Sequence, residues 1–217
     1  MKHKKPVANN EGRIVNPDQM SDLEIEAEAS RILGKAGIEA GTFYDEVESV
    51  EFPRLTPPAP KDYSPEFYEG SIRMYREFAR VFGEPRSVFY PACYVDASPI
   101  RGFPNSEVIL LDRDDFAAQV MQNAGIPLLH MPIEQYHGKK HDLIILFNQM
   151  FHPSLAIPFL ERGGKIIANN YHHTASDLRD MGHPILGVFD GDDRYVSIEQ
   201  ASEELRSAGG TYVIGGK

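Results

Sequence analysis

Histidine is concentrated in the second half of this chain, where seven of the eight histidines follow residue 129. His152 follows one apolar run, and the pair His172-His173 follows the next. A neutral imidazole can act as a general base, and a converging set completed by Asp190 or Asp192 could hold Zn²⁺ or Fe²⁺. The third interpretation is that these are exposed or hydrogen-bonded loop histidines without chemistry. The spacing does not decide among the three, and we assign no metal ligand.

Asp112 stands at the end of another apolar run and is the acid best placed to bind a sugar. A carboxylate at the end of a buried strand can accept two hydrogen bonds from a ribose diol, which suits adenosine and dinucleotide ligands alike. The alternative is structural. In that case Asp112 and Asp114 would cap the helix that follows and interact with its dipole.

Cys93 is the only cysteine, which excludes an intrachain disulfide and a cysteine-rich zinc site within one chain. A nucleophilic cysteine would need a paired base or the start of a long helix, and the sequence indicates neither beside it. We therefore expect a small buried thiol. The Gly-x-Ser-x-Gly motif of hydrolases and the Gly-Lys-Ser/Thr motif of phosphate-binding loops are both absent.

A sheet must position these residues, and five short apolar runs between residues 87 and 168 predict one. A strand buried on both faces is a continuous apolar run, and its parallel neighbour is reached through a crossover, usually a helix. The predicted strands cover 87–90, 107–111, 128–131, 143–147 and 165–168, with weaker strands at 186–189, 195–197 and 211–214. The predicted helices cover 64–82, a short segment from 98, 114–124, 153–160, 174–179 and 198–208, with Gly163-Gly164 as a helix stop.

The composition changes before the sheet begins. A capped helix is predicted between Ser21 and Gly37, and five prolines within 52–65 favour an extended strap. We expect an N-terminal extension over 1–63 and an α/β domain over 64–217.

The overall composition limits the possible partners. A chain of 217 residues with 41% hydrophobic content can bury one substantial core. The formal net charge of -10 argues against nucleic-acid phosphates as a partner. No apolar segment follows the basic start, and no run has the length that spans a bilayer. We therefore expect a cytoplasmic protein without a membrane or nucleic-acid partner.

Four features, taken in chain order, resemble the S-adenosylmethionine-dependent methyltransferases with the Rossmann-like fold. Val88-Phe89-Tyr90 occupies the first strand, Asp112 closes the second, His141-Asp142 opens the fourth, and Gly163-Gly164 precedes the fifth. The likeness covers roughly residues 65–215. It implies a doubly wound, mostly parallel α/β sheet with strands in the order three-two-one-four-five and later strands beyond, and S-adenosylmethionine as the cofactor.

The first turn departs from the family pattern, which has glycines there because a backbone without Cβ can turn sharply and lie against a ligand. This chain has Tyr90-Pro91-Ala92-Cys93-Tyr94 instead, and Tyr90 stands where the family usually carries an acid. After the third strand Pro132 replaces an acid that would meet adenine, and Glu134 could reach the same place. The resemblance implies a cofactor-binding set of Tyr90, Pro91, Ala92, Cys93, Asp112, Arg113 and Glu134.

Asn148 follows the fourth strand, in the segment that lines the substrate side of the pocket in this family. An asparagine with a nearby histidine is similar to what small-molecule methyltransferases have there. The Asn-Pro-Pro-aromatic signature of enzymes that act on nucleic acids or proteins is absent. The resemblance thus implies methyl transfer to a small molecule, with Asn148, His152 and His172 as the catalytic set. The alternative is a non-catalytic protein of this fold that binds a partner protein or another ligand through the altered crevice.

Overall fold

The computed structural model describes residues 7–8, 14–15, 63–203 and 210–216. The chain divides into two units, Met1–Leu55 and Thr56–Lys217. In the first unit, strand β1 (Val7–Ala8) pairs antiparallel with β2 (Ile14–Val15). The predicted N-terminal helix and most of the proline-rich segment lie outside the described residues, and the boundary expected at residue 63 stays a prediction.

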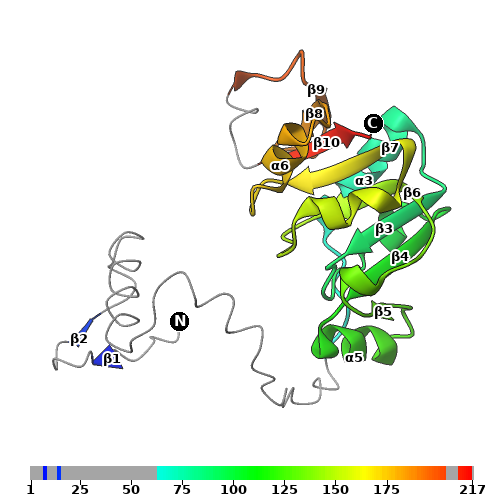
Figure 1. Ribbon diagram of the computed structural model, residues 1–217, viewed down its shortest axis with the longest axis vertical. Coiled ribbons are helices and arrows are strands. Elements are labelled where there is room, and N and C mark those ends of the chain that lie inside the picture. The colour runs from blue at the N-terminus through cyan, green and yellow to red at the C-terminus, as the bar shows by residue number, and fades with distance from the viewer. Residues whose placement is uncertain (1–6, 9–13, 16–62, 204–209, 217) are drawn as a thin grey trace. The chain divides into compact units, whose positions relative to one another are not determined.

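The second unit contains one sheet of eight strands, in the order β5-β4-β3-β6-β7-β10-β8-β9 (Figure 1). The strands β5, β4, β3, β6 and β7 are parallel to one another, whereas β10 is antiparallel to β7 and β8, and β9 is antiparallel to β8. Their bounds are β3 Ser87–Pro91, β4 Glu107–Asp112, β5 Leu129–His130, β6 His141–Leu146, β7 Leu160–Asn169, β8 Ile185–Phe189, β9 Tyr195–Ser197 and β10 Thr211–Gly215. All eight predicted strands are present, and the predicted order of the first five is confirmed.

The sheet is buried on both faces, which explains why its central strands are continuous apolar runs. Successive side chains of a strand point to opposite faces. In β6, Ile144 and Leu146 belong to one hydrophobic cluster, while Leu143 and Ile145 belong to the other. All four side chains are fully buried. Burial of each stabilises the fold by about 1.5–3 kcal/mol relative to exposure.

Helix α3 (Glu69–Phe82) covers one face of the sheet with Tyr75 and Phe78, as its aromatic spacing predicts, and it ends at Gly83 with φ +84°. Its predicted start at residue 64 is wrong. The Glu66 backbone is already engaged, because its N–H donates to the Val95 carbonyl and its carbonyl accepts from the Ala97 N–H. These long-range bonds hold residues 66–68 outside the helix.

The other helices have different neighbours, and α5 (Asp115–Asn123) is the one at an edge strand of the sheet. Figure 1 shows α5 next to β5 and α6 (Thr174–Asp180) next to β7 and β10. Asp114 caps α5, since its carboxylate accepts a hydrogen bond from the Ala117 N–H at 2.9 Å. The short helix α4 (Ser98–Gly102) begins with a proline in its first turn, as predicted. No helix within the described residues is long and apolar enough to cross a bilayer.

The predicted helix over 153–160 is wrong, because two 3₁₀ turns, Pro153–Leu155 and Ile157–Phe159, take its place. Pro158 has no N–H to donate into a helical ladder. Leu160 already pairs with His141 of β6, so β7 begins earlier than predicted. Gly163-Gly164 is therefore not a helix stop but lies within β7, where φ +78° at Gly163 accompanies a register shift.

The helix predicted over 198–208 is not present where the structure describes that segment before Glu203. Residues 198–200 form a turn, and the Ile198 N–H donates to the Leu186 carbonyl at 2.9 Å. This bond continues the pairing of β8 with β9 and competes with helix formation. Residues 204–209 lie outside the described residues.

Candidate functional site

A cavity of about 610 Å³ opens at the carboxyl ends of β3 and β6. These neighbouring strands are the point where the connections diverge, since β3 leads to β4 on one side and β6 leads to β7 on the other. Ligands of open α/β sheets bind at such a switch point, and the volume is typical of small-molecule sites. The lining residues are Tyr68, Gly70, Ser71, Met74, Tyr90, Ala92, Cys93, Tyr94, Val95, Asp96, Phe147, Asn148, Asn169, Asp193 and Thr211.

The loop after β3 contains no glycine, but two of its residues have a backbone conformation that glycine adopts more easily than other residues. Ala92 has φ +56° and Tyr94 has φ +50°, both in the left-handed region. A residue with a Cβ in that region costs of order 1–3 kcal/mol, so the surroundings must hold it. The Cys93 N–H donates to the Leu111 carbonyl at 3.3 Å, and the Asp96 N–H donates to the Cys93 carbonyl at 2.9 Å.

Asp112 fastens this loop to the end of β4. Its Oδ2 accepts from the Tyr94 N–H at 2.6 Å, and its Oδ1 accepts from the Asp114 N–H at 2.9 Å. The side chain is only 8% exposed and does not line the cavity. A carboxylate has about four acceptor sites, so two remain for a ligand. The ribose role stays a prediction, while the structural role of Asp112 is directly visible.

The cavity wall contains a buried acid that was not among the site residues predicted from the sequence. Asp96 is 8% exposed, and its Oδ2 accepts from the Tyr90 hydroxyl at 3.2 Å while its Oδ1 accepts from the Ser98 N–H at 2.8 Å. Burial raises the pKa of Asp96, and the hydrogen bonds from Ser98 and Tyr90 oppose that rise. The available signal was an acid two residues before a Ser-Pro helix start, a spacing typical of a local cap.

Two phenols and a thiol lie close to this acid. Burial raises the pKa of Tyr90 and of Tyr75 well above the ordinary tyrosine value, and Asp96 adds to both shifts. The Tyr75 hydroxyl is buried and finds no hydrogen-bond partner among the described residues. Burial, with Asp112 and Asp96 nearby, also raises the pKa of Cys93, so its thiol stays protonated. This environment does not favour a nucleophilic thiolate, in line with the expected buried thiol.

Asn148 and Asn169, at the ends of β6 and β7, form a pair on another wall of the cavity. The Asn148 N–H donates to Asn169 Oδ1 at 3.3 Å, which identifies the oxygen of that amide. Asn169 Nδ2 therefore donates to Asn148 Oδ1, at 2.6 Å. No acceptor for the Asn148 Nδ2 group is found among the described residues, so both of its hydrogens are available to a ligand. Asn148 has φ +52°, a conformation that asparagine tolerates better than most residues.

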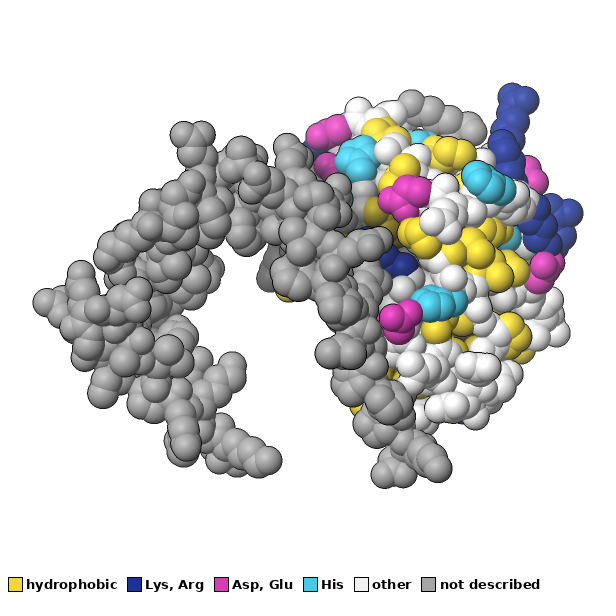
Figure 2. Space-filling view, turned by 60° about the horizontal axis from the view of Figure 1, so that its bottom comes forward, with side chains coloured by type: hydrophobic (Ala, Val, Ile, Leu, Met, Phe, Trp, Pro, Cys, Tyr) yellow, Lys and Arg dark blue, Asp and Glu magenta, His cyan; other side chains and the backbone are white. Residues whose placement is uncertain are grey.

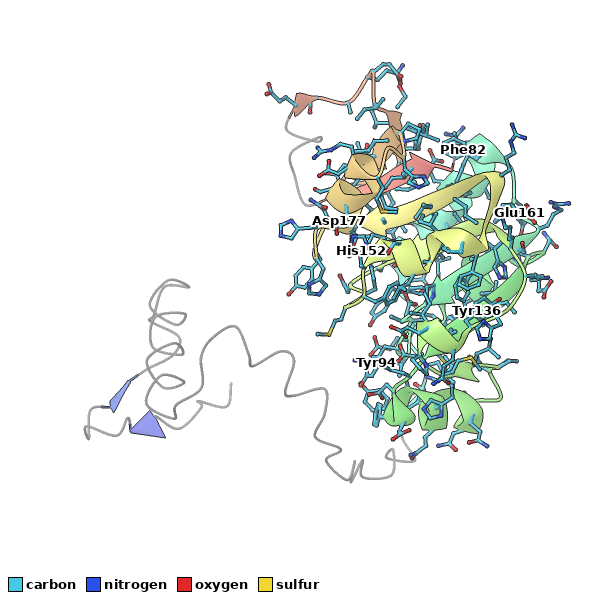
Figure 3. All side chains as sticks on the ribbon, viewed as in Figure 1. Phe82, Tyr94, Tyr136, His152, Glu161 and Asp177 are labelled. Atoms are coloured by element: carbon cyan, nitrogen blue, oxygen red, sulfur yellow. The ribbon has the colours of Figure 1, made fainter. Side chains whose placement is uncertain are left out.

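The other predicted site residues lie elsewhere. Arg113, Glu134, His152 and His172 are exposed, Pro91 is buried at the end of β3, and none of these five lines the cavity. His152 caps a 3₁₀ turn by accepting from the Ser154 N–H at 3.3 Å. Figure 3 shows His152 well separated from Tyr94. The cavity thus brings together Tyr90, Ala92, Cys93 and Asn148 from the predicted set.

The seven histidines that the structure describes do not converge. On the face shown in Figure 2 the histidine side chains lie apart from one another. Among the described residues, no group of three or more histidine, cysteine, aspartate or glutamate side chains could hold a metal ion. The candidate pair His152 and His172 therefore forms neither a cluster with acids nor part of the cavity wall.

The cavity is acidic and aromatic. Its described lining includes two acids, Asp96 and Asp193, and no lysine, arginine or histidine. Three tyrosines and Phe147 provide ring faces or edges. Such a surface attracts positive charge and disfavours phosphates and other ligands with a net negative charge.

Comparison with known proteins gives no match to a family model and none to a curated protein sequence. Several solved structures are similar in fold. The N-methyltransferase NodS from Bradyrhizobium japonicum, in complex with S-adenosyl-L-homocysteine, has a TM-score of 0.48 at 10% identity, over 80% of this chain and 97% of that one. The cofactor-bound protein Rv0187 from MTB has a TM-score of 0.47 at 16% identity, over 91% of this chain and 98% of that one.

An O-methyltransferase from Thermotoga maritima has a TM-score of 0.45 at 10% identity, over 71% of this chain and 67% of that one. Scores and identities this low carry no argument about activity. The order and direction of the strands in this chain define the fold. It is a Rossmann-like α/β fold of the methyltransferase type.

Proposed function

We propose that the switch-point cavity binds S-adenosylmethionine and that the protein transfers its methyl group to a small molecule. The observation that carries the proposal is the place and charge of the cavity. It opens at the carboxyl ends of β3 and β6, and its described lining has two acids and no basic side chain. S-adenosylmethionine has a positively charged sulfur and no phosphate. Phosphate-bearing nucleotides would meet the same acids unfavourably.

The residues of the cavity fit this cofactor in size and polarity. The volume of about 610 Å³ lies within the range of small-molecule sites. Asp96, which lines the cavity, supplies negative charge, and Asp112, behind the loop, is the candidate for the ribose. Tyr90, Ala92 and Cys93 form the adjacent wall. When bound, the cofactor would supply an electrophilic methyl group.

The contribution of the chain to the reaction would be alignment. Holding two reactants in the correct geometry can supply a large part of a rate enhancement without a strong base. Neither His152 nor His172 lines the cavity, so the predicted histidine base has no support from the lining. Asn148 would instead orient the methyl acceptor through its free Nδ2 hydrogens. The expected cytoplasmic location belongs to this proposal.

The alternative function is that of a non-catalytic protein with an altered crevice. One observation favours it. The Tyr94 side chain, on the loop where the family pattern has glycines, is 47% exposed and stacks near Phe116 with ring centroids 6.1 Å apart. An exposed aromatic ring beside a crevice is suited to contact with a partner protein.

Calorimetric titration distinguishes the two. We expect heat with S-adenosylmethionine and S-adenosylhomocysteine and none with ATP or NAD⁺. Asp96→Asn should weaken the binding of S-adenosylmethionine more than that of S-adenosylhomocysteine, because only the former has the charged sulfur. Glu161→Gln, an exposed acid outside the cavity, serves as the control. Absence of binding to both sulfur compounds would eliminate the methyltransferase proposal. Binding to both without turnover on a broad panel of methyl acceptors would favour the non-catalytic alternative.

A further inference from the structure

One carboxylate of the cavity lies away from the β3 loop, on the turn between β8 and β9. The turn is rigidly built, because Asp190 Oδ1 accepts from the N–H groups of Asp192 and Arg194, both at 2.9 Å. The Asp193 N–H donates to the Asp190 carbonyl at 3.0 Å, and Asp193 has φ +62°. The fixed turn brings Asp193 to the start of α3, next to Gly70.

Asp193 is only partly neutralised. Arg73 of α3 contacts it with Nη2 at 2.8 Å and Nε at 3.0 Å, and both contacts fall on Oδ2. No hydrogen bond to Asp193 Oδ1 is found among the described residues. The Arg73 side chain is 62% exposed whereas that of Asp193 is 24% exposed, so water screens the arginine more than the acid. Asp193, which lines the cavity, thus keeps one oxygen without a partner among the described residues.

Aromatic side chains also line the cavity. Tyr68, at the start of α3, and Phe147, at the end of β6, line the same cavity as Asp193. Carboxylates combined with aromatic rings are the groups that recognise organic cations, since the ring face carries partial negative charge. A ligand whose only charge is a carboxylate would instead face Asp193 and Asp96 without a lysine, arginine or histidine among the described lining residues to pair with it.

We propose that Asp193, together with aromatic side chains that line the same cavity, such as Tyr68 and Phe147, binds an amine-bearing organic cation with an aromatic or apolar body. The inference rests on the proposed function in one respect, namely that this cation is the methyl acceptor. The β3 loop with Asp96 would serve the cofactor, and Asp193 would serve the acceptor. Asp193 is a binding and specificity residue in this scheme.

The test uses three probes that share a phenyl body: 2-phenylethylamine, 3-phenylpropanol and 3-phenylpropionate. Each is titrated into the full-length protein with and without saturating S-adenosylhomocysteine. We expect the amine to bind at least about tenfold more tightly than the alcohol, and the carboxylate not to bind measurably. Equal binding of amine and carboxylate, or binding of neither, would overturn the proposal.

Charge variants make the test specific to Asp193. Asp193→Asn should weaken amine binding about fivefold to tenfold, as expected for a partly screened charge pair. Asp192→Asn removes the same charge from an exposed neighbour in the same turn and should leave amine binding unchanged. Arg73→Gln should strengthen amine binding about twofold to threefold, because it frees the second oxygen of Asp193. A loss of affinity in Arg73→Gln equal to that in Asp193→Asn would show that the ion pair only supports the fold, and would overturn the proposal.

The two proposals fail separately. If S-adenosylhomocysteine does not bind, the methyltransferase proposal fails, and the titration of amine alone still decides the cation site. If S-adenosylhomocysteine binds and the amine preference is absent, only the cation site fails.

Discussion

Asp112→Asn is the substitution whose effect can best be worked out from the contacts. The carboxylate accepts two backbone hydrogen bonds, at 2.6 Å from Tyr94 and at 2.9 Å from Asp114. Asparagine keeps one oxygen and places an N–H₂ group against the other donor. The loss of one hydrogen bond to a charged group costs about 1.5–3 kcal/mol, and the remaining bond weakens because its acceptor is now neutral. We expect a total destabilisation of about 3 kcal/mol.

The assay is equilibrium unfolding in urea, followed by circular dichroism. A loss of about 3 kcal/mol corresponds to a fall in Tm of roughly 6–12 °C for a domain of this size. The control is Arg113→Ala, an exposed neighbour expected to change stability by less than about 0.5 kcal/mol. A change of that small size in Asp112→Asn would refute the role of Asp112 in holding the loop. Affinity for S-adenosylmethionine, measured well below both values of Tm, then tests the ribose role independently.

Three further predictions concern buried groups. Burial raises the pKa of Asp96, so the folded state should lose stability as the pH rises from the ordinary aspartate pKa through the raised value. Asp96→Asn does not titrate and should not show that loss. Urea unfolding at several pH values measures this, and a loss of equal size in the variant would contradict it. Burial lowers the pKa of His141, so the unfolded state takes up a proton at a higher pH than the folded state. The stability of the protein should therefore fall as the pH drops below the ordinary histidine pKa. His141→Gln should reduce that fall in the same experiment. A fall of equal size in the variant would assign it to another group. The buried, protonated thiol of Cys93 should react with dithiobis(nitrobenzoate) at least about a hundredfold more slowly in native protein than in urea, and rapid native reaction would show that the loop opens readily.

The strands were predictable because a strand that is buried on both faces is a continuous run of apolar residues in the sequence. The failed helix predictions share a different cause. Glu66, Leu160 and Ile198 each use their backbone in a bond to a residue far away or on another strand. Local capping and spacing signals contain no information about such partners, so a helical pattern was overridden by tertiary hydrogen bonds.

The site was predictable where it depends on position along the sheet. Tyr90, Ala92, Cys93 and Asn148 line the cavity because they lie at or just beyond the carboxyl ends of the neighbouring parallel strands β3 and β6. Asp193 could not be found in this way, because it reaches the cavity only where the turn between β8 and β9 meets the start of α3. The sequence identifies the loop after β3 as unusual but not its conformation. Left-handed backbone at Ala92 and Tyr94 is enforced from outside, by groups such as Asp112.

The two short edge strands have a consequence for behaviour at high concentration. The sheet ends on one side with β5, of two residues, and on the other with β9, of three residues. An exposed edge strand is a template on which another chain can add a strand, and its length sets how many intermolecular hydrogen bonds can form. Edge strands this short can form too few intermolecular hydrogen bonds for stable edge-to-edge association. The sheet itself therefore provides little template for the growth of fibrils.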